Sequence, residues 1–466
     1  MVVNDVHSGM NPTSVSAIER PRTVEALQAI VRRAASAGDS IVLSGSRHAM
    51  GGQQFLRDRL LVDLRGMDRV LELDEQRGLV RVEAGIQWPA LIARLHELQR
   101  GTAPREEPRW GIAQKQTGAD DLTLGGAVAA NIHGRGLLMA PLASDLESIT
   151  VVDARGELVR ASRTEHPELF RGVIGGYGLL GAVADVTLRL VPRRKLRRVV
   201  RIIDIEDAVN AAQRRIDAGF IYGDFQFDVD PASPEFLTKG VFSCYQPVPD
   251  DTPMPAPARE LSGDDWINLL HLAHVDKREA FAQYARHYLS TDGQLYWSDL
   301  HQLGVYLDGY HAEVDRRLGA SCPGGEMITE VYVPPERLVD FLKDAAAMLT
   351  RRQAPVIYGT IRLIQADDLT LLAWARQVFA CVIFNLHVDR SNEGMARVAP
   401  AFGDLIDLAI DRGGSFYLTY HRFATRAQIE RAYPGMEAFR ALKRAWDPGR
   451  VFASDWHDWL ESTLRA

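Results

Sequence analysis

A short glycine-bounded segment near the N-terminus has residue types suited to holding an anionic ligand. The run Ser44-Gly45-Ser46-Arg47-His48-Ala49-Met50-Gly51-Gly52 directly follows the apolar residues 41–43, which predicts a strand that ends in a loop. Glycine lets backbone N–H groups approach a ligand closely, and a nest of such groups suits a pyrophosphate. A histidine in this turn would lie against that ligand. Alternatively, the segment is only a tight turn with a solvated histidine.

A second segment, residues 117–134, begins with polar, turn-forming residues and then changes character. The glycine pair Gly125-Gly126 is followed by small residues as far as Asn131-Ile132-His133-Gly134. Small residues at helical spacing allow a backbone to pack tightly on a flat partner. That partner is either a ligand or the sheet of a protein core.

A third segment carries glycines in a misleading pattern. Gly176, Gly178 and Gly181 satisfy the G-x-G-x-x-G pattern of nucleotide-binding βαβ units, which requires a strand before it and a helix at its third glycine. Here a helix-like stretch precedes the glycines, and the alternating residues 182–190 predict a strand after them. The sequence therefore predicts no Rossmann site for a nicotinamide cofactor.

Taken in order, the three segments resemble the vanillyl-alcohol oxidase superfamily, also called the p-cresol methylhydroxylase (PCMH)-type FAD-binding fold. The likeness covers roughly the first 190 and roughly the last 50 residues. It is strongest to the alditol oxidases, the aldonolactone oxidases and decaprenylphosphoryl-ribose oxidase, and residues 446–455 look like the end of the last of these. The resemblance implies FAD bound between an N-terminal subdomain and the rest of the fold, with a cap domain over the isoalloxazine ring.

Hydrophobic periodicity predicts an α+β protein that fits this arrangement. Helices are expected over 23–37, 88–99, 393–412 and after Pro335, and strands over 41–44, 60–64, 70–74, 79–84, 221–229, 239–245, 327–333, 356–364 and 379–388, with a hairpin at 148–159. We predict a two-subdomain FAD-binding PCMH-type domain over 1–194 and a substrate-binding cap domain over 195–414 with a central antiparallel sheet. Residues 415–466 are expected to return to the FAD-binding domain.

Composition excludes several classes of protein. The net charge of −7 argues against a dedicated nucleic-acid binder. No apolar run approaches the ~20 residues of a spanning helix, and the N-terminus lacks a signal-peptide pattern, so we expect no integral membrane segment and a cytoplasmic location. Cys244, Cys322 and Cys381 have no close spacing, which predicts neither disulfides nor a metal site. Cys381 fits a core position.

The resemblance assigns FAD contacts to three stretches and three single positions. They comprise Gly45, Ser46, Arg47, His48, Ala49, Met50, Gly51, Gly118, Thr123, Leu124, Gly125, Gly126, Ala130, Asn131, His133, Val183 and Tyr417.

Two histidines among these positions carry more specific expectations. In alditol and aldonolactone oxidases the residue at the position of His48 is bonded to the flavin 8α-methyl group, whereas decaprenylphosphoryl-ribose oxidase lacks this histidine. We expect a covalent link, the alternative being His48 packed on dissociable FAD. Ala119 stands where bicovalent relatives carry a second, cysteine link. His133 either bonds near the flavin or substrate, or is a structural loop residue.

Substrate contacts are expected from the predicted cap strands. Residues 358–362 resemble the alditol-oxidase strand that carries Glu-x-Arg, and here Arg362 is present but Thr360 replaces the glutamate. Both would share one sheet face; alternatively, Arg362 is exposed on an edge strand. Asn385 stands where the sugar oxidases carry a substrate-binding threonine, with His387 on the same face.

The clearest departure from the relatives lies at Tyr420, where they carry a functional lysine. A perturbed tyrosinate can act as a base, whereas the adjacent His421 has an ordinary pKa closer to neutral pH. Neighbours in a strand face opposite ways, so we expect only one to reach the flavin. Tyr420 is preferred for its position, and His421 is the second candidate.

These observations predict an FAD-dependent oxidoreductase. It would take hydride from a CH–OH group of a sugar, polyol or lactone-like small molecule to flavin N5, and oxygen or another acceptor would reoxidise the flavin. Two alternatives remain: an amine or phenolic-alcohol oxidase on the same fold, or a non-catalytic flavoprotein of a biosynthetic pathway.

Overall fold

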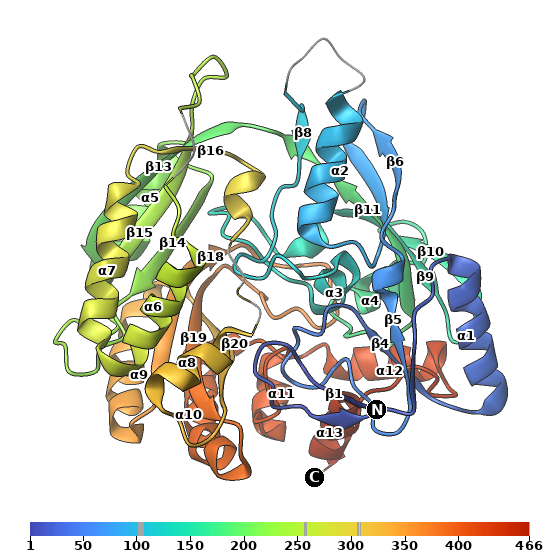
Figure 1. Cartoon of the computed structure of the whole chain (residues 1–466). Helices are drawn as coiled ribbons and strands as arrows, with labels where there is room; N and C mark the ends of the chain where they lie inside the picture. Colours follow the sequence, from blue (N-terminus) through green and yellow to red (C-terminus); the bar gives the residue numbers. More distant parts are fainter. Residues whose placement is uncertain (101–106, 256–258, 305–306, 308, 466) are drawn as a thin grey trace.

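The architecture combines three main sheets in an α+β arrangement (Figure 1). The computed structural model describes residues 1–100, 107–255, 259–304, 307 and 309–465. Two short strand pairs, β1 (Val2–Val3) with β2 (Thr13–Ser14) and β8 (Trp110–Gly111) with β12 (Val191–Pro192), complete the strand pairing within these residues. No helix of the described residues is long and apolar enough to span a bilayer.

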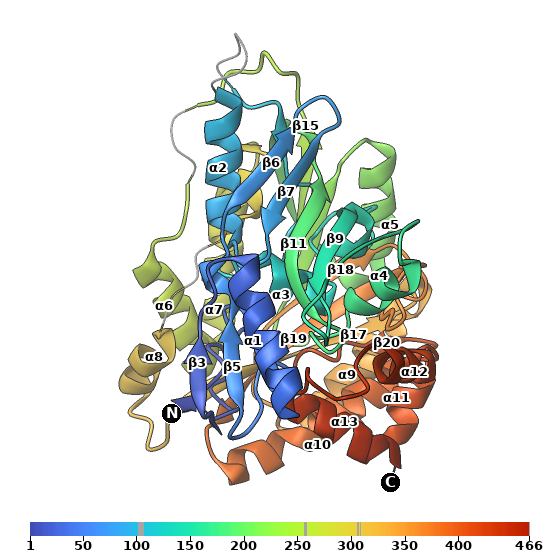
Figure 2. The ribbon, with the colours of Figure 1, turned by 90° about the vertical axis from the view of Figure 1, so that its right-hand side faces the viewer.

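The first sheet is parallel, and it delivers the first glycine-bounded loop. Its strand order is β3 (Ala17–Glu19), β5 (Leu60–Asp63), β4 (Ile41–Ser44), with α1 (Val24–Ala37) linking β3 to β4. The side chain of Thr23 caps the start of α1 and Gly38 ends it in the left-handed conformation. Figure 2 shows α1 lying alongside β5 and β3. The loop after β4 therefore starts from a strand whose position is fixed by its sheet and by α1.

The second sheet is antiparallel and carries the second and third segments. Its order is β10 (Leu158–Ser162), β9 (Leu146–Val152), β11 (Ala182–Arg189), β7 (Leu79–Glu83), β6 (Val70–Asp74). The accompanying helices are α2 (Trp88–Arg100), α3 (Leu124–Ala130) and α4 (Pro167–Val173). Because α4 precedes the G-x-G-x-x-G glycines and β11 follows them, the order of elements is the predicted one, opposite to that of a Rossmann unit.

The third sheet contains eight strands, every pair of which is antiparallel. Its order is β16 (Leu295–Trp297), β13 (Lys195–Asp204), β15 (Lys239–Pro247), β14 (Tyr222–Phe227), β18 (Val356–Ile364), β19 (Phe379–Asp389), β17 (Gly324–Val333), β20 (Ser415–Phe416). Its helices are α5 (Ile205–Asp217), α6 (Gly263–Val275), α7 (Lys277–Ser290), α8 (Tyr310–Leu318), α9 (Leu338–Arg352) and α10 (Asn392–Ile410).

Helices cover both faces of this sheet. Val241 packs with residues of α7, whereas its neighbour Phe242 borders a small cavity beside α5. Since successive strand residues point to opposite faces, these two helices lie on opposite sides. The strands and helices predicted from periodicity are confirmed here to within a few residues at each end.

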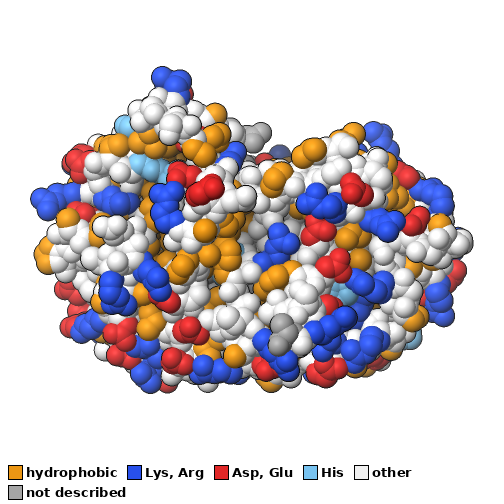
Figure 3. All heavy atoms as spheres, turned by 90° about the horizontal axis from the view of Figure 1, so that it is seen from below, with side chains coloured by type: hydrophobic (Ala, Val, Ile, Leu, Met, Phe, Trp, Pro, Cys, Tyr) orange, Lys and Arg blue, Asp and Glu red, His pale blue; other side chains and the backbone are white. Residues whose placement is uncertain are grey.

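The C-terminal residues run back to the first sheet. After β20 come α11 (Arg426–Ala432), α12 (Met436–Trp446) and α13 (Asp455–Arg465). Between the last two helices, the Ile41 amide donates to Val451 O at 2.7 Å and the Ala453 amide donates to Ile41 O at 3.1 Å, so the tail adds to the edge of β4. Seen from below in Figure 3, basic and acidic side chains are interspersed over the visible face.

Candidate active site

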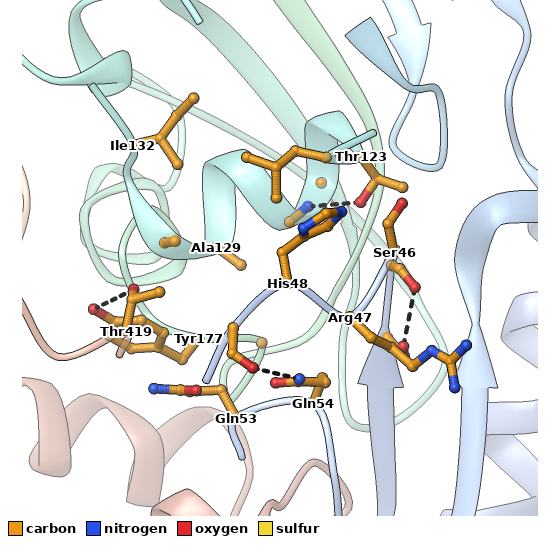
Figure 4. Close-up of a pocket in the computed structure, with 18 of the residues that line it drawn as sticks. Ser46, Arg47, His48, Gln53, Gln54, Thr123, Ala129, Ile132, Tyr177 and Thr419 are labelled. Atoms are coloured by element: carbon orange, nitrogen blue, oxygen red, sulfur yellow. Dashed lines mark hydrogen bonds between the residues drawn. The ribbon is translucent and has the colours of Figure 1, made fainter. Parts of the chain in front are cut away.

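One large cavity lies where the loop after β4, the segment before and within α3, the loop before β11 and the turn after β20 meet (Figure 4). It contains about 1410 Å³ of space not filled by protein, its mouth included. Fourteen predicted site residues line it: Gly45, Ser46, Arg47, His48, Ala49, Met50, Gly118, Thr123, Gly125, Gly126, Ala130, Val183, Tyr417 and Tyr420.

Glycine is required where the two loops touch. A Cβ at Gly45 would stand 2.1 Å from Thr123 Oγ1, a distance that no relaxed contact allows. Thr123 Oγ1 in turn accepts a hydrogen bond from the Gly126 amide at the start of α3. Gln87 links the loops from behind by donating to Ser46 Oγ at 3.1 Å and to Asp121 O at 2.7 Å. These contacts fix the positions of the two loops relative to each other without help from a ligand.

Unsatisfied polar atoms on the wall indicate that a polar ligand belongs there. Nε2 of His7 and Oε1 of Gln53, Gln54 and Gln116 are buried without a hydrogen-bond partner among the described residues, and all four residues line the cavity. Buried polar groups without partners are uncommon in native proteins. Together with the cation of Arg47, they fit FAD, which offers polar ring edges, hydroxyls and an anionic pyrophosphate.

Four of the residues predicted to contact FAD are not among those that line the cavity. They are Gly51, Leu124, Asn131 and His133. Asn131 ends α3 in the left-handed conformation, donates to Asp367 Oδ2 at 2.9 Å and accepts from the Ala143 amide at 2.9 Å. Leu124 is a core residue of the same helix. Asn131 and Leu124 therefore hold the wall in place from behind.

The predicted substrate residue Arg362 is buried, not exposed on an edge strand. Its strand β18 lies between β14 and β19 in the sheet, so the edge-strand alternative is wrong. Arg362 Nη2 donates to Thr117 Oγ1 at 2.6 Å, and Thr117 lines the cavity although Arg362 does not. Thr360 is turned to a structural role, since its hydroxyl donates to Phe225 O. Arg362 therefore supports the wall through Thr117.

Asn385 also lies one layer behind the cavity. Its Nδ2 donates to Glu326 Oε2 at 2.6 Å, and its Oδ1 is buried without a partner among the described residues. It pairs across the sheet with Ile328, which does line the cavity. His387 packs edge-on against His274 at a centroid distance of 4.7 Å, away from the cavity wall.

Of the two candidate bases, only Tyr420 faces the cavity. His421 bonds to Thr329 Oγ1 at 3.1 Å through Nε2, and its ring packs against those of Phe402 and Phe423. Burial lowers the pKa of His421 to about 3, so the ring is neutral and enclosed. Residues 418–420 form a turn instead of the expected strand, yet the two neighbouring side chains still diverge.

A buried carboxylate that the sequence analysis missed controls Tyr420. The Tyr420 hydroxyl donates to Glu330 Oε1 at 2.7 Å, while Glu330 Oε2 accepts from the Tyr332 hydroxyl and pairs with His133 Nε2, each at 2.9 Å. The one sequence signal is an acidic residue within an otherwise apolar stretch, residues 327–333. His133 is therefore a buried partner of this carboxylate.

The protonation states follow from burial and neighbouring charge. Burial alone would raise the pKa of Glu330, but the charge and hydrogen bond of His133 and the hydroxyl of Tyr420 outweigh it and lower this pKa. Burial and the nearby Glu330 charge raise the pKa of Tyr420 far above its usual value. The resting pair is thus a carboxylate and a protonated phenol, which corrects the idea of a standing tyrosinate base.

Comparison with known proteins relates an N-terminal and a C-terminal part of the chain to FAD-linked enzymes. A family model described as FAD binding domain matches residues 15–162, and one described as FAD linked oxidases, C-terminal domain, matches residues 310–455. The chain belongs to the superfamily of FAD-linked oxidases with the PCMH-type FAD-binding fold. It is an FAD-linked oxidoreductase.

The relatives of this FAD-linked oxidase include proteins named for sugar lactones. It is 25% identical over 448 residues to an L-gulono-1,4-lactone dehydrogenase of Mycobacterium tuberculosis, covering 95% of each chain. It is 30% identical over 195 residues to a D-arabinono-1,4-lactone oxidase of Yarrowia lipolytica, covering 41% of this chain and 35% of that protein. A mitochondrial L-galactono-1,4-lactone dehydrogenase of Brassica oleracea is 28% identical over 204 residues, or 43% and 31% of the two chains.

Proposed function

We propose that this FAD-linked oxidase dehydrogenates a neutral, sugar-derived lactone at one of its CH–OH groups. The relative that aligns over 95% of the chain is named for such a lactone. Arg47 is the one Lys, Arg, Asp or Glu among the residues that line the described cavity, so the wall offers no second charge for a phosphorylated or acidic substrate. The hydrogen bond between Tyr420 on the wall and the carboxylate of Glu330 is the observation that carries the proposal.

FAD, when bound, supplies the hydride acceptor, and the protein must then remove the proton of the substrate hydroxyl. Tyr420 Oη accepts this proton as it passes its own along the 2.7 Å hydrogen bond to Glu330 Oε1. For each proton that the substrate hydroxyl loses, the carboxylate of Glu330 therefore gains one. His133 and Tyr332 hold the other carboxylate oxygen and so keep Oε1 directed at Tyr420.

We further propose that His48 bonds covalently to the flavin. His48 extends from the loop after β4 toward Thr123 on the cavity wall (Figure 4). Burial, the largest effect, lowers the pKa of His48 to about 4, so the imidazole is neutral at physiological pH. A neutral ring keeps the lone pair that bond formation to carbon requires.

The covalent link is tested by denaturing the purified protein in acid. The yellow colour should remain with the precipitate of the wild type and pass into the supernatant for His48→Ala. Release of the wild-type flavin would reject the covalent link while leaving FAD binding intact.

The substrate class is tested by mixing flavin-loaded protein with aldono-1,4-lactones, alditols, aldoses, amines and phenolic alcohols without oxygen. Lactones should bleach the visible flavin absorbance fastest. Admitting oxygen or an artificial dye to the reduced protein then identifies the acceptor class. The proposal fails if the fully loaded flavin is bleached only by amines or phenolic alcohols, or by none of the compounds.

A further inference from the structure

Three side chains with different donor atoms converge behind Tyr420. His133 follows α3, Glu330 lies in β17 and Cys381 lies in β19, and all three are fully buried. His133 Nε2 and Glu330 Oε2 are 2.9 Å apart, and Cys381 Sγ is 3.8 Å from each. Cys381 is a free cysteine, so a nitrogen, an oxygen and a sulfur donor occupy the corners of one small triangle.

The dimensions of this triangle suit a tetrahedral metal ion. Zinc binds nitrogen and oxygen at about 2.0–2.2 Å and thiolate sulfur at about 2.3 Å, so neighbouring ligands around it stand ~3.3–3.6 Å apart. The observed separations of 2.9 and 3.8 Å bracket that range, and shifts of a few tenths of an ångström would close the site. Mixed nitrogen, oxygen and sulfur donors favour zinc-like ions over magnesium or calcium.

The surrounding hydrogen bonds orient the donors as in metal sites. His133 Nδ1 bonds to Gly134 O at 3.0 Å, which leaves Nε2 pointing at Glu330 and Cys381. The Tyr332 hydroxyl bonds to Glu330 Oε2 and fixes the carboxylate from outside. Such outer contacts typically set the tautomer and direction of metal ligands. Tyr420, which lines the cavity, donates to the other oxygen of Glu330, so the cluster is linked to the cavity wall through this side chain.

We propose that the His133–Glu330–Cys381 cluster binds one thiophilic divalent cation such as Zn²⁺, and that occupancy inhibits the enzyme. On binding, the thiol loses its proton and becomes a thiolate, and His133 gives up the proton between Nε2 and Glu330. The ion thus replaces two protons, and Tyr420 or water supplies the fourth ligand. The inhibition rests on the proposed function, because a metal-bound Glu330 can no longer take the proton of Tyr420. Metal binding is independent of the proposed function.

The test adds Zn²⁺ to flavin-loaded protein that has been stripped of metal. Equilibrium dialysis with elemental analysis should give one ion per chain for the wild type. Cys244→Ser, which changes the other buried free cysteine, should behave identically. Cys381→Ser should bind at least ~100-fold more weakly, because loss of a direct ligand should exceed the ~10–100-fold cost of outer-shell changes. Equal affinity in wild type and Cys381→Ser would overturn the proposal.

A second measurement does not depend on that variant folding. The zinc X-ray absorption spectrum of the loaded wild type should show one sulfur ligand, and a spectrum with nitrogen and oxygen ligands only would reject the site. Zn²⁺ should also inhibit turnover with the dissociation constant found by dialysis. If zinc binds as described but no lactone is oxidised, the metal site stands and the proposed function fails.

Discussion

The loops next to the two smaller main sheets and the strands of the eight-stranded sheet build the same cavity in different ways. The loops supply contiguous segments of the wall: residues 44–50 form one side and residues 116–119 part of another. The eight-stranded sheet supplies single residues from separate strands that act from behind, such as Glu330 in β17 and Arg362 in β18. The difference teaches that local sequence determines where the cofactor lies, whereas strand pairing determines which groups handle the proton.

The largest expected effect comes from removing the negative charge of Glu330 in β17. Glu330→Gln should lower kcat by ~10²–10⁴-fold, because the proton of Tyr420 loses its acceptor. Flavin content should not change, since Glu330 does not line the cavity. Steady-state kinetics per bound flavin, together with the loss of the acid limb of the kcat–pH profile, check this prediction.

The matched control for Glu330→Gln is Glu326→Gln, a second buried carboxylate in β17 that bonds Tyr310 and Asn385 instead of Tyr420. Its effect on kcat should be much smaller, and its pH profile should keep the acid limb. Equal losses in the two variants would mean that both carboxylates only stabilise the strand.

A smaller effect is expected at the cavity surface. Tyr420→Phe should reduce kcat by about 10²-fold, the lower end for a proton-transfer group, because the phenyl ring fills the same space without the hydroxyl. His421→Gln should leave the rate of flavin reduction nearly unaltered, since His421 is buried against Phe402 and Phe423 and does not line the cavity. Stopped-flow reduction by substrate compares the two; the reverse ranking would make His421 the base.

A change in the flavin-binding half should affect stability and cofactor retention instead of chemistry. Gly45→Ala would place a methyl group 2.1 Å from Thr123 Oγ1 and should cost ~1–3 kcal/mol of unfolding free energy, as overpacking does. Gly403→Ala, in α10 with no heavy atom within 4 Å of the new methyl, should be neutral or stabilising. Denaturant titration measures both, and equal stability of the two variants would contradict the role of Gly45.

The last expected effect appears only in acid and concerns stability. The pKa of buried His421 is lowered to about 3, whereas an unfolded histidine titrates near its ordinary value of 6.5. Below that value the unfolded state binds more protons, so stability falls as the pH drops from 6.5 toward 3, by up to ~1.4 kcal/mol per pH unit for this one ring. His421→Gln should flatten the pH dependence of the denaturation midpoint; an unchanged slope would argue against it.

The sequence was most informative where one segment holds its own signals. The apolar run before Ser44, the cap of α1 at Thr23 and the glycines that border the cavity are local features, and the predicted elements follow them closely. The order of helix and strand correctly excluded a Rossmann unit at the G-x-G-x-x-G glycines. Two of these glycines, Gly178 and Gly181, nevertheless border the cavity.

The amino-acid sequence by itself determined the α+β elements, the FAD-linked class and the two loops that approach the cofactor. Tertiary structure alone decided that His133, Glu330 and Cys381 meet, that Tyr420 faces the cavity, and that Arg362 and Asn385 stand behind it. The reason is physical: propensity, capping and glycine geometry act between near neighbours in the chain. The register of β17 with β19, which sets Glu330 opposite Ile383, arises from pairing between residues 47 to 65 positions apart.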